Sequence, residues 1–170
     1  MGGIFLKVAF LDRDGTLNKD YPDNEWFDKK TPEILPGTVD GLTYLKEKGY
    51  ELIIITNQYI IGEGYISCLH YKEFNDKLMD ALRKESIEIL DIFHCPHSRK
   101  SKCNCHKPSR GLIIQALNKY PDIDLKSSIY IGDSISDLVL ANKFRLKFYG
   151  INFNCKNQLD NLSQIREYIL

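Results

Sequence analysis

The feature that most constrains the fold is a short, nearly continuous apolar run near the amino terminus that ends abruptly in charged residues. The run covers residues 4–11 (IFLKVAFL), and Asp12 follows it directly. A run of this length without polar alternation is typical of a strand buried on both faces, as in parallel sheets. Because such sheets bind ligands at the carboxyl ends of their strands, the charged residues mark a candidate site.

The same pattern recurs along the 170 residues. Further buried strands are predicted at residues 50–55, 87–93, 128–131 and 146–149. Helical spacing of apolar residues predicts helices after the turn at residues 36–38, after Ser67, and at residues 111–120, 134–143 and 158–170. Because strands alternate with helices, the expected fold is a doubly wound α/β sheet. The length fits a single domain over residues 1–170.

Charge and cysteine content exclude several classes of protein. Lys and Arg together number 23, as do Asp and Glu, and proteins that bind a nucleic-acid backbone are normally basic. We therefore expect no nucleic-acid partner. No apolar run approaches about 18 residues, and residues 1–10 lack the features of a secretory signal, so no membrane partner is expected. Five cysteines, an odd number, argue against a disulfide framework and favour the reducing cytoplasm.

Polar clusters follow several predicted strands or precede helices. They are residues 12–16 (DRDGT), 56–58 (TNQ), Lys107 and 133–137 (DSISD). In the first cluster, Asp12 and Asp14 can divide the work of nucleophile and general acid, and carboxylates are ligands that Mg²⁺ prefers. Each cluster alone has a simpler interpretation: an Asp-Gly turn, a polar strand end, a solvated lysine, or a helix N-cap with favourable acids. Their order and expected position at one sheet edge favour a catalytic site.

A metal site is predicted in the loop at residues 95–107. Cys95, His97, Cys103 and Cys105 form the tetrahedral ligand set that is typical of structural Zn²⁺. Four protein ligands leave no open position for water, so a catalytic zinc is not expected. His94 and His106 flank the set and could replace one ligand. The simpler interpretation is a loop with free thiols and no metal.

Taken in order, the four polar clusters resemble those of the haloacid dehalogenase-like phosphohydrolases. The motifs of that superfamily are DxDGT, a Thr or Ser after the second strand, a Lys, and GDxxxD, and the resemblance covers about residues 4–150. It implies a Rossmann-like parallel sheet and aspartyl-phosphate chemistry. It also implies Asp12 as nucleophile, Asp14 as general acid and base, and Mg²⁺ held by Asp12, Asp133 and the backbone carbonyl of Asp14.

The resemblance implies roles for further residues of the site. Lys107 would offset the charge of the attacked phosphate, and Thr56 would donate a hydrogen bond to it. Asp137 would orient Lys107 or support the metal. Asn57 and Arg110 are expected to bind substrate. Arg110 belongs to a basic run that either attracts a small anion or is simply a solvated face. The run consists of Arg99, Lys100, Lys102, Lys107 and Arg110.

The metal loop narrows the resemblance within the superfamily. TNQ, CPH, and CxC just before Lys-Pro are similar to the D-glycero-D-manno-heptose 1,7-bisphosphate phosphatases and to the phosphatase part of histidinol-phosphate phosphatase. Both groups carry zinc in this loop and lack a large cap domain, and residues 17–35 are too few for a separate lid. The chain departs from their usual TNQSGI continuation, since Tyr59 follows the TNQ, Glu63 stands where a basic residue is expected, and His106 replaces an Arg.

The expected function is therefore Mg²⁺-dependent hydrolysis of a phosphate monoester by a cytoplasmic monomer. The expected substrate is a heptose bisphosphate attacked at its 7-phosphate, or a similar sugar phosphate. Histidinol phosphate is an alternative, in which Glu63 or Glu25 would face the amine. A polynucleotide 3′-phosphatase and a zinc-stapled binding module without catalysis are the remaining alternatives, and zero net charge disfavours the first.

Overall fold

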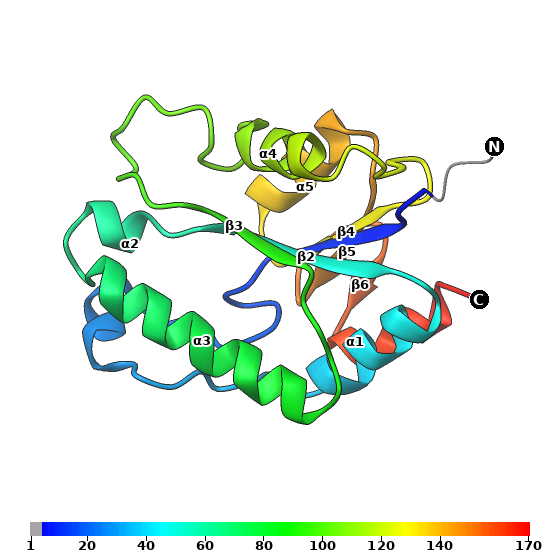
Figure 1. Cartoon of the computed structure of the whole chain (residues 1–170), viewed down its shortest axis with the longest axis horizontal. Coiled ribbons are helices and arrows are strands. Elements are labelled where there is room, and N and C mark those ends of the chain that lie inside the picture. The colour runs from blue at the N-terminus through cyan, green and yellow to red at the C-terminus, as the bar shows by residue number, and fades with distance from the viewer. Residues whose placement is uncertain (1–4) are drawn as a thin grey trace.

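The computed structural model describes residues 5–170, and its strands form one six-stranded parallel sheet (Figure 1). The strands are β1 (Val8–Leu11), β2 (Glu51–Asn57), β3 (Asp91–Cys95), β4 (Ile129–Gly132), β5 (Lys147–Ile151) and β6 (Gln158–Leu159). Their order is β3-β2-β1-β4-β5-β6, and every neighbouring pair is parallel. Strand order reverses between β1 and β4, so the ligand-binding crevice is expected at their carboxyl ends. The doubly wound, Rossmann-like fold is confirmed.

Helices cover both faces of the sheet. They are α1 (Thr38–Glu47), α2 (Tyr59–Gly62), α3 (Cys68–Lys84), α4 (Gly111–Lys119) and α5 (Ile135–Lys143), with 3₁₀ helices η1 (Asp23–Asp28) and η2 (Leu162–Glu167). In Figure 1, α4 and α5 lie on one face, and α1 and α3 on the other. Ala9 and Leu11 of β1 belong to the core beneath α1 and α3, whereas Val8 and Phe10 belong to the core beneath α4 and α5. Because β1 is buried on both faces, it carries an uninterrupted apolar sequence.

Two predicted elements differ from the structure. The third strand is β3 at Asp91–Cys95 rather than residues 87–93, because Ile87 instead packs into the core beneath α1 and α3. The closing helix at residues 158–170 is wrong: β6 pairs with β5 there, and only η2 is helical. The first residue of the predicted strand 4–11 lies outside the described residues.

The segment between β1 and α1 is short and packs on the body of the protein. Its only helix is η1, where Trp26 lies 5.3 Å from Phe74 of α3, between ring centroids. Ile60, Ile66 and Tyr71 complete this small aromatic and aliphatic cluster. Among the described residues there is therefore no large cap domain, as expected, and the carboxyl ends of the strands remain accessible. No helix within residues 5–170 has the length and apolar character needed to cross a membrane.

Candidate active site

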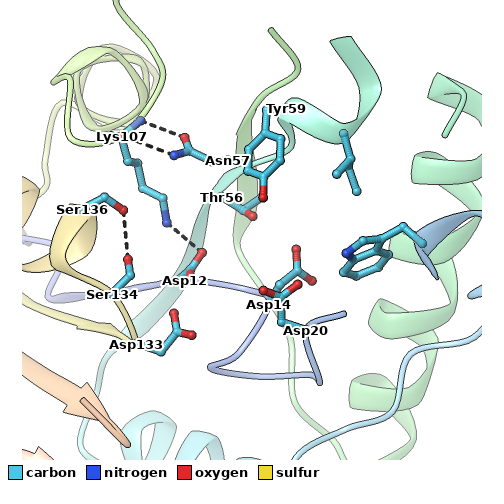
Figure 2. Close-up of a pocket in the computed structure, with 12 residues that line it drawn as sticks. Asp12, Asp14, Asp20, Thr56, Asn57, Tyr59, Lys107, Asp133, Ser134 and Ser136 are labelled. Carbon is cyan, nitrogen blue, oxygen red and sulfur yellow. Dashed lines mark hydrogen bonds and ion pairs between the residues drawn. The ribbon is translucent and has the colours of Figure 1, made fainter. Parts of the chain in front are cut away.

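The predicted polar residues meet at the carboxyl ends of β1, β2 and β4 (Figure 2). Asp12 follows β1, Thr56 lies at the end of β2, Asp133 follows β4, and Lys107 comes from the loop before α4. They line one cavity of about 230 Å³. Its complete lining is Asp12, Asp14, Asp20, Trp26, Thr56, Asn57, Tyr59, Ile60, Lys107, Asp133, Ser134 and Ser136. The topological switch point thus holds the candidate site.

Lys107 is buried at the floor of the cavity. Its Nζ donates to Asp12 Oδ1 at 2.7 Å, to Asp137 Oδ1 at 2.7 Å and to the Ile55 carbonyl at 2.9 Å. Burial opposes its charge, but Asp12 and Asp137 outweigh burial and raise the pKa of Lys107. Lys107 is therefore a fixed cation directly beside the candidate nucleophile.

Asp137 is fully buried, and both of its carboxylate oxygens are engaged. Oδ1 accepts from Lys107 and from the Tyr130 hydroxyl at 2.9 Å, and Oδ2 accepts from Ser134 Oγ at 2.6 Å. A carboxylate saturated in this way is a support rather than a free ligand. Of the two roles expected for Asp137, the geometry favours the orientation of Lys107.

Asp12 and Asp133 form the part of the site that suits a divalent cation. Burial, together with Asp137 and opposed by Lys107, raises the pKa of Asp12 well above its ordinary value. Burial is also the main cause that raises the pKa of Asp133 to about 6. Oxygens of Asp12, Asp133 and Asp137 all lie within 4.8 Å of one another. Because Asp137 is saturated, the carboxylates of Asp12 and Asp133 are the hard oxygen donors that fit Mg²⁺.

The glycine of the DRDGT motif allows this crowding. Gly15 has a φ of +84°, in the left-handed region that favours glycine. A Cβ built at this position would collide with the Asp133 carboxylate. The loop after β1 can therefore lie directly against the residue that follows β4, which brings two motifs distant in sequence into contact.

Asp14 is oriented by a set of donors that sequence reasoning missed in part. Its carboxylate accepts two bonds from Arg13, both at 2.9 Å, one from Gln58 at 2.7 Å and one from Asn18 at 2.9 Å. These four bonds fix the orientation of the carboxylate. Arg13 is itself buried and donates to Asn75 Oδ1 at 2.6 Å. An arginine placed between the two aspartates was the available signal, but only the fold shows what it binds.

Asn57 and Arg110, the two further residues expected to bind substrate, have different surroundings. Asn57 lines the cavity, yet its amide pairs with the backbone of Lys107, donating at 3.2 Å and accepting at 2.8 Å. Arg110 does not line the cavity; it is exposed and donates weakly to the Lys143 carbonyl at 3.4 Å. Asn57 thus fixes the lysine segment, whereas Arg110 is not among the lining residues, and its role in binding substrate stays a prediction.

The four predicted zinc ligands converge in the loop after β3. Cys95 Sγ lies 3.2 Å from Cys105 Sγ and 3.7 Å from Cys103 Sγ, and His97 Nδ1 lies 3.2 Å from Cys105 Sγ. Ligands about 2.3 Å from a central zinc would be roughly 3.8 Å apart in a tetrahedron, so the set fits Zn²⁺ after small adjustments. The set contains no disulfide.

The pKa values of the cysteine thiols and the positions of the two flanking histidines further define the metal cluster. Although burial opposes it, nearby backbone N–H groups lower the pKa of Cys103 to about 7, which favours a thiolate. Burial raises the pKa of Cys95. The alternative ligands His94 and His106 lie outside the cluster, and their rings face Tyr71 and Tyr59.

Similarity to known proteins identifies the family of this chain. A family model described as "Polynucleotide kinase 3 phosphatase" matches residues 7–150. The chain belongs to this haloacid dehalogenase-like phosphatase family. It is 44% identical over 140 residues to a D-glycero-alpha-D-manno-heptose-1,7-bisphosphate 7-phosphatase of Photorhabdus laumondii, covering 78% of this chain and 75% of that protein. The chain is a phosphatase of the haloacid dehalogenase-like type.

A further relative agrees with this assignment, and a solved structure agrees with the fold. The chain is 36% identical over 138 residues to a D-glycero-beta-D-manno-heptose-1,7-bisphosphate 7-phosphatase of Haemophilus influenzae, covering 78% of this chain and 73% of that protein. Its fold matches the crystal structure of a D,D-heptose 1,7-bisphosphate phosphatase from B. bronchiseptica complexed with magnesium and phosphate, with a TM-score of 0.85 at 24% identity. That match covers 96% of this chain and 97% of the other.

Proposed function

We propose that this phosphatase removes the 7-phosphate of a heptose 1,7-bisphosphate or a closely similar sugar phosphate. The observation that carries the proposal is the relation to 7-phosphatases at 36% to 44% identity in a chain whose cavity holds the required side chains. Relatives named for the alpha and the beta anomer share the 7-phosphatase part of their names, so the proposal concerns the 7-phosphate.

The first half of the proposed reaction transfers the phosphoryl group to the protein. An oxygen of Asp12 attacks phosphorus, and the bond from phosphorus to the sugar oxygen breaks. Lys107, 2.7 Å from Asp12 Oδ1, offsets part of the negative charge on the transferring group. Thr56 donates to a phosphoryl oxygen, and Asp14 gives its proton to the departing sugar oxygen.

The second half restores the protein. Asp14, now ionised, removes a proton from water, and the resulting hydroxide attacks phosphorus and releases inorganic phosphate and free Asp12. The four hydrogen bonds that Asp14 accepts hold its carboxylate in place for this step. Arg13 and Gln58 thus position the group that donates a proton in the first half of the reaction and accepts one in the second.

The two metals have separate roles in this proposal. Asp12, Asp133 and the backbone carbonyl of Asp14 would hold Mg²⁺, which supplies positive charge opposite the phosphate. The need is evident from the cavity lining, where four aspartates face Lys107 as the sole cation among the described lining residues. Cys95, His97, Cys103 and Cys105 would hold Zn²⁺ and tie down the loop that leads to Lys107.

The alternatives find less support. A histidinol phosphate amine would want a free acid, but Glu63 pairs with Arg99, and Glu25 lies 3.7 Å from Lys29. The relatives from Photorhabdus laumondii and Haemophilus influenzae are named for heptose bisphosphate rather than for histidinol phosphate or polynucleotide ends. We further propose one domain over residues 1–170, a monomer, and a cytoplasmic location, because the three thiols of the zinc set need reducing surroundings.

The test is release of phosphate from heptose 1,7-bisphosphate in the presence of Mg²⁺, with ³¹P NMR to show which phosphate is lost. We expect the signal of the 7-phosphate to disappear while that of the 1-phosphate persists. Histidinol phosphate is the competing substrate, and Asp12→Asn is the matched control for contaminating phosphatase. A higher kcat/KM for histidinol phosphate, or loss of the 1-phosphate first, would contradict the proposal.

A further inference from the structure

Part of the cavity wall has no role in the proposed reaction. Trp26, Tyr59 and Ile60 supply its apolar surface. In Figure 2, Tyr59 extends from the start of α2 with its hydroxyl end toward the cavity, across from Lys107 and Asp133. Phosphate gains nothing from an apolar wall, so this surface faces the organic part of the substrate.

Tyr59 is held in place from outside the cavity. Its hydroxyl donates to Asp23 Oδ1 at 3.0 Å, and the guanidinium carbon of Arg99 lies 4.1 Å from the centroid of its ring. Arg99 does not line the cavity, so the ring separates the guanidinium from the substrate space. Stacking of a guanidinium on an aromatic face restricts the motion of both groups.

Arg99 is fixed in turn by two acids from different segments. Its Nη2 donates to Asp23 Oδ2 at 2.8 Å, and its Nε donates to Glu63 Oε1 at 2.9 Å. The backbone N–H of Arg99 also donates to Glu63 Oε1 at 3.0 Å. One exposed ion pair contributes little, but a forked arginine shared by two carboxylates and a ring specifies one geometry. We call Arg99, Asp23 and Glu63 the Arg99 bridge.

The bridge joins three segments that are distant in sequence. Asp23 begins η1, Glu63 is the C-cap of α2, and Arg99 belongs to the loop that carries the zinc ligands. It also accounts for Glu63, the acid that stands where a basic residue was expected. The position of Tyr59 therefore depends on all three segments at once.

We propose that Tyr59 is a specificity-determining residue, whose ring forms the wall against which the carbon chain of the sugar packs, held there by the Arg99 bridge. This inference rests on the proposed function, because it places the sugar in the same cavity. Burial and Asp23 raise the pKa of Tyr59 to about 12, so its hydroxyl stays protonated and keeps donating to Asp23. The ring thus offers the sugar apolar surface rather than charge.

The experiment compares Tyr59→Ala with wild type on heptose 1,7-bisphosphate and on acetyl phosphate, whose leaving group has no sugar chain to pack against the ring. We expect KM for the sugar bisphosphate to rise about tenfold with little change in kcat, and kcat/KM for acetyl phosphate to fall much less than that for the sugar bisphosphate. Tyr59→Phe should keep most of the selectivity because it keeps the ring. Tyr65→Ala is the matched control, since Tyr65 is partly exposed and does not line the cavity.

The Arg99 bridge is tested by Arg99→Ala alone and combined with Tyr59→Ala. Because Arg99 acts through the ring, the single variant should raise KM in the same direction by less, and the double variant should equal Tyr59→Ala. Additive losses in the double variant, or equal losses on both substrates, would overturn the inference. Should Tyr59→Ala fail to fold, Tyr59→Leu and Arg99→Ala provide the same comparison.

These results separate the inference from the proposed function. A wild-type protein that cleaves acetyl phosphate but no sugar phosphate overturns the proposed substrate and the inference with it. A wild-type protein selective for the sugar bisphosphate, whose selectivity survives Tyr59→Ala, overturns only the role of Tyr59.

Discussion

At the scale of single residues, Asp12 faces opposing demands. As a nucleophile it must be ionised, yet burial and the nearby acids raise its pKa, and Lys107 only partly opposes them. A divalent cation bound by Asp12 and Asp133 would reverse this balance. The buried ion pair with Lys107 orients the attacking oxygen, while added positive charge keeps it ionised.

Replacement of Asp12 by Asn keeps the size of the side chain but removes the attacking oxygen charge. We expect kcat to fall by about 10⁴-fold or more, as is usual when a covalent nucleophile is removed. The measurement is steady-state phosphate release at saturating Mg²⁺, with circular dichroism to confirm folding. Asp20→Asn is the matched control, since Asp20 lines the same cavity but takes no part in attack. More than a tenth of the wild-type rate in Asp12→Asn would exclude a covalent mechanism at Asp12.

Affinity for Mg²⁺ should depend on pH through Asp133. Its pKa is raised to about 6, so below that pH the cation must displace a proton, and above it the carboxylate is free. We expect the dissociation constant for Mg²⁺ to be about tenfold larger at pH 5 than at pH 7. Because the pKa of Asp12 is also raised, its protonation should increase this difference further. Calorimetric titration measures it, and Asp133→Asn should bind weakly with a smaller pH effect. An unchanged affinity would remove Asp133 from the metal site.

The residues of the site were predictable where a local motif carries the chemistry. Asp12, Asp14, Thr56, Lys107 and Asp133 each stand next to a strand end or a recognisable pattern, and the cavity brings them together. Tertiary contacts decide the rest. The links of Arg13 to Asn75 and of Tyr59 to Asp23 join segments far apart in sequence, so no local spacing reveals them. Arg110 shows the converse: its nearness to Lys107 in sequence does not bring it to the cavity.

At the scale of elements, local signals set boundaries well where a cap is present. Ser67 accepts from the His70 backbone N–H at 3.0 Å and starts α3 as predicted. Prediction failed where pairing with a distant strand decided the structure. At the carboxyl end, helical spacing at residues 158–170 competed with an edge strand, and β6 paired with β5 before η2 began. Periodicity cannot detect such pairing because the partner strand is remote.

Within the zinc loop, the most informative change is the loss of one metal ligand. Cys105 is two residues from Lys107, so ligation of Cys105 restrains the lysine segment. We expect wild type to bind one zinc per chain. The Cys105→Ser variant should lose the zinc, melt at a lower temperature and have a lower kcat, while its affinity for Mg²⁺ stays unchanged. Elemental analysis, thermal melts and Mg²⁺ titration measure these effects. Cys155→Ser is the control and should keep its zinc. Zinc-free wild type, purified without chelators, would contradict the assignment.

At the scale of the whole molecule, charge decides which substrates can approach. Net charge is zero, and the basic run in the metal loop is weaker than its sequence implies, because Arg99 is paired with Glu63 and Asp23. The cavity itself is lined by four aspartates and Lys107. A small phosphate ester brings charge that a bound cation can offset, whereas a nucleic acid brings many phosphates that need an extended basic surface.

The name of the family model makes a 3′-phosphorylated oligonucleotide the decisive comparison. Since the chain has no net positive charge, we expect kcat/KM for this oligonucleotide to be lower than for heptose 1,7-bisphosphate by about a hundredfold or more. Its cleavage should also vary little between about 50 and 200 mM salt, because few phosphates would be neutralised on binding. The two substrates are compared at equal free Mg²⁺ and at both salt concentrations. Preference for the oligonucleotide, with a steep loss of activity as salt rises, would show that the protein binds a nucleic-acid backbone. The substrate would then be a polynucleotide end rather than a sugar phosphate.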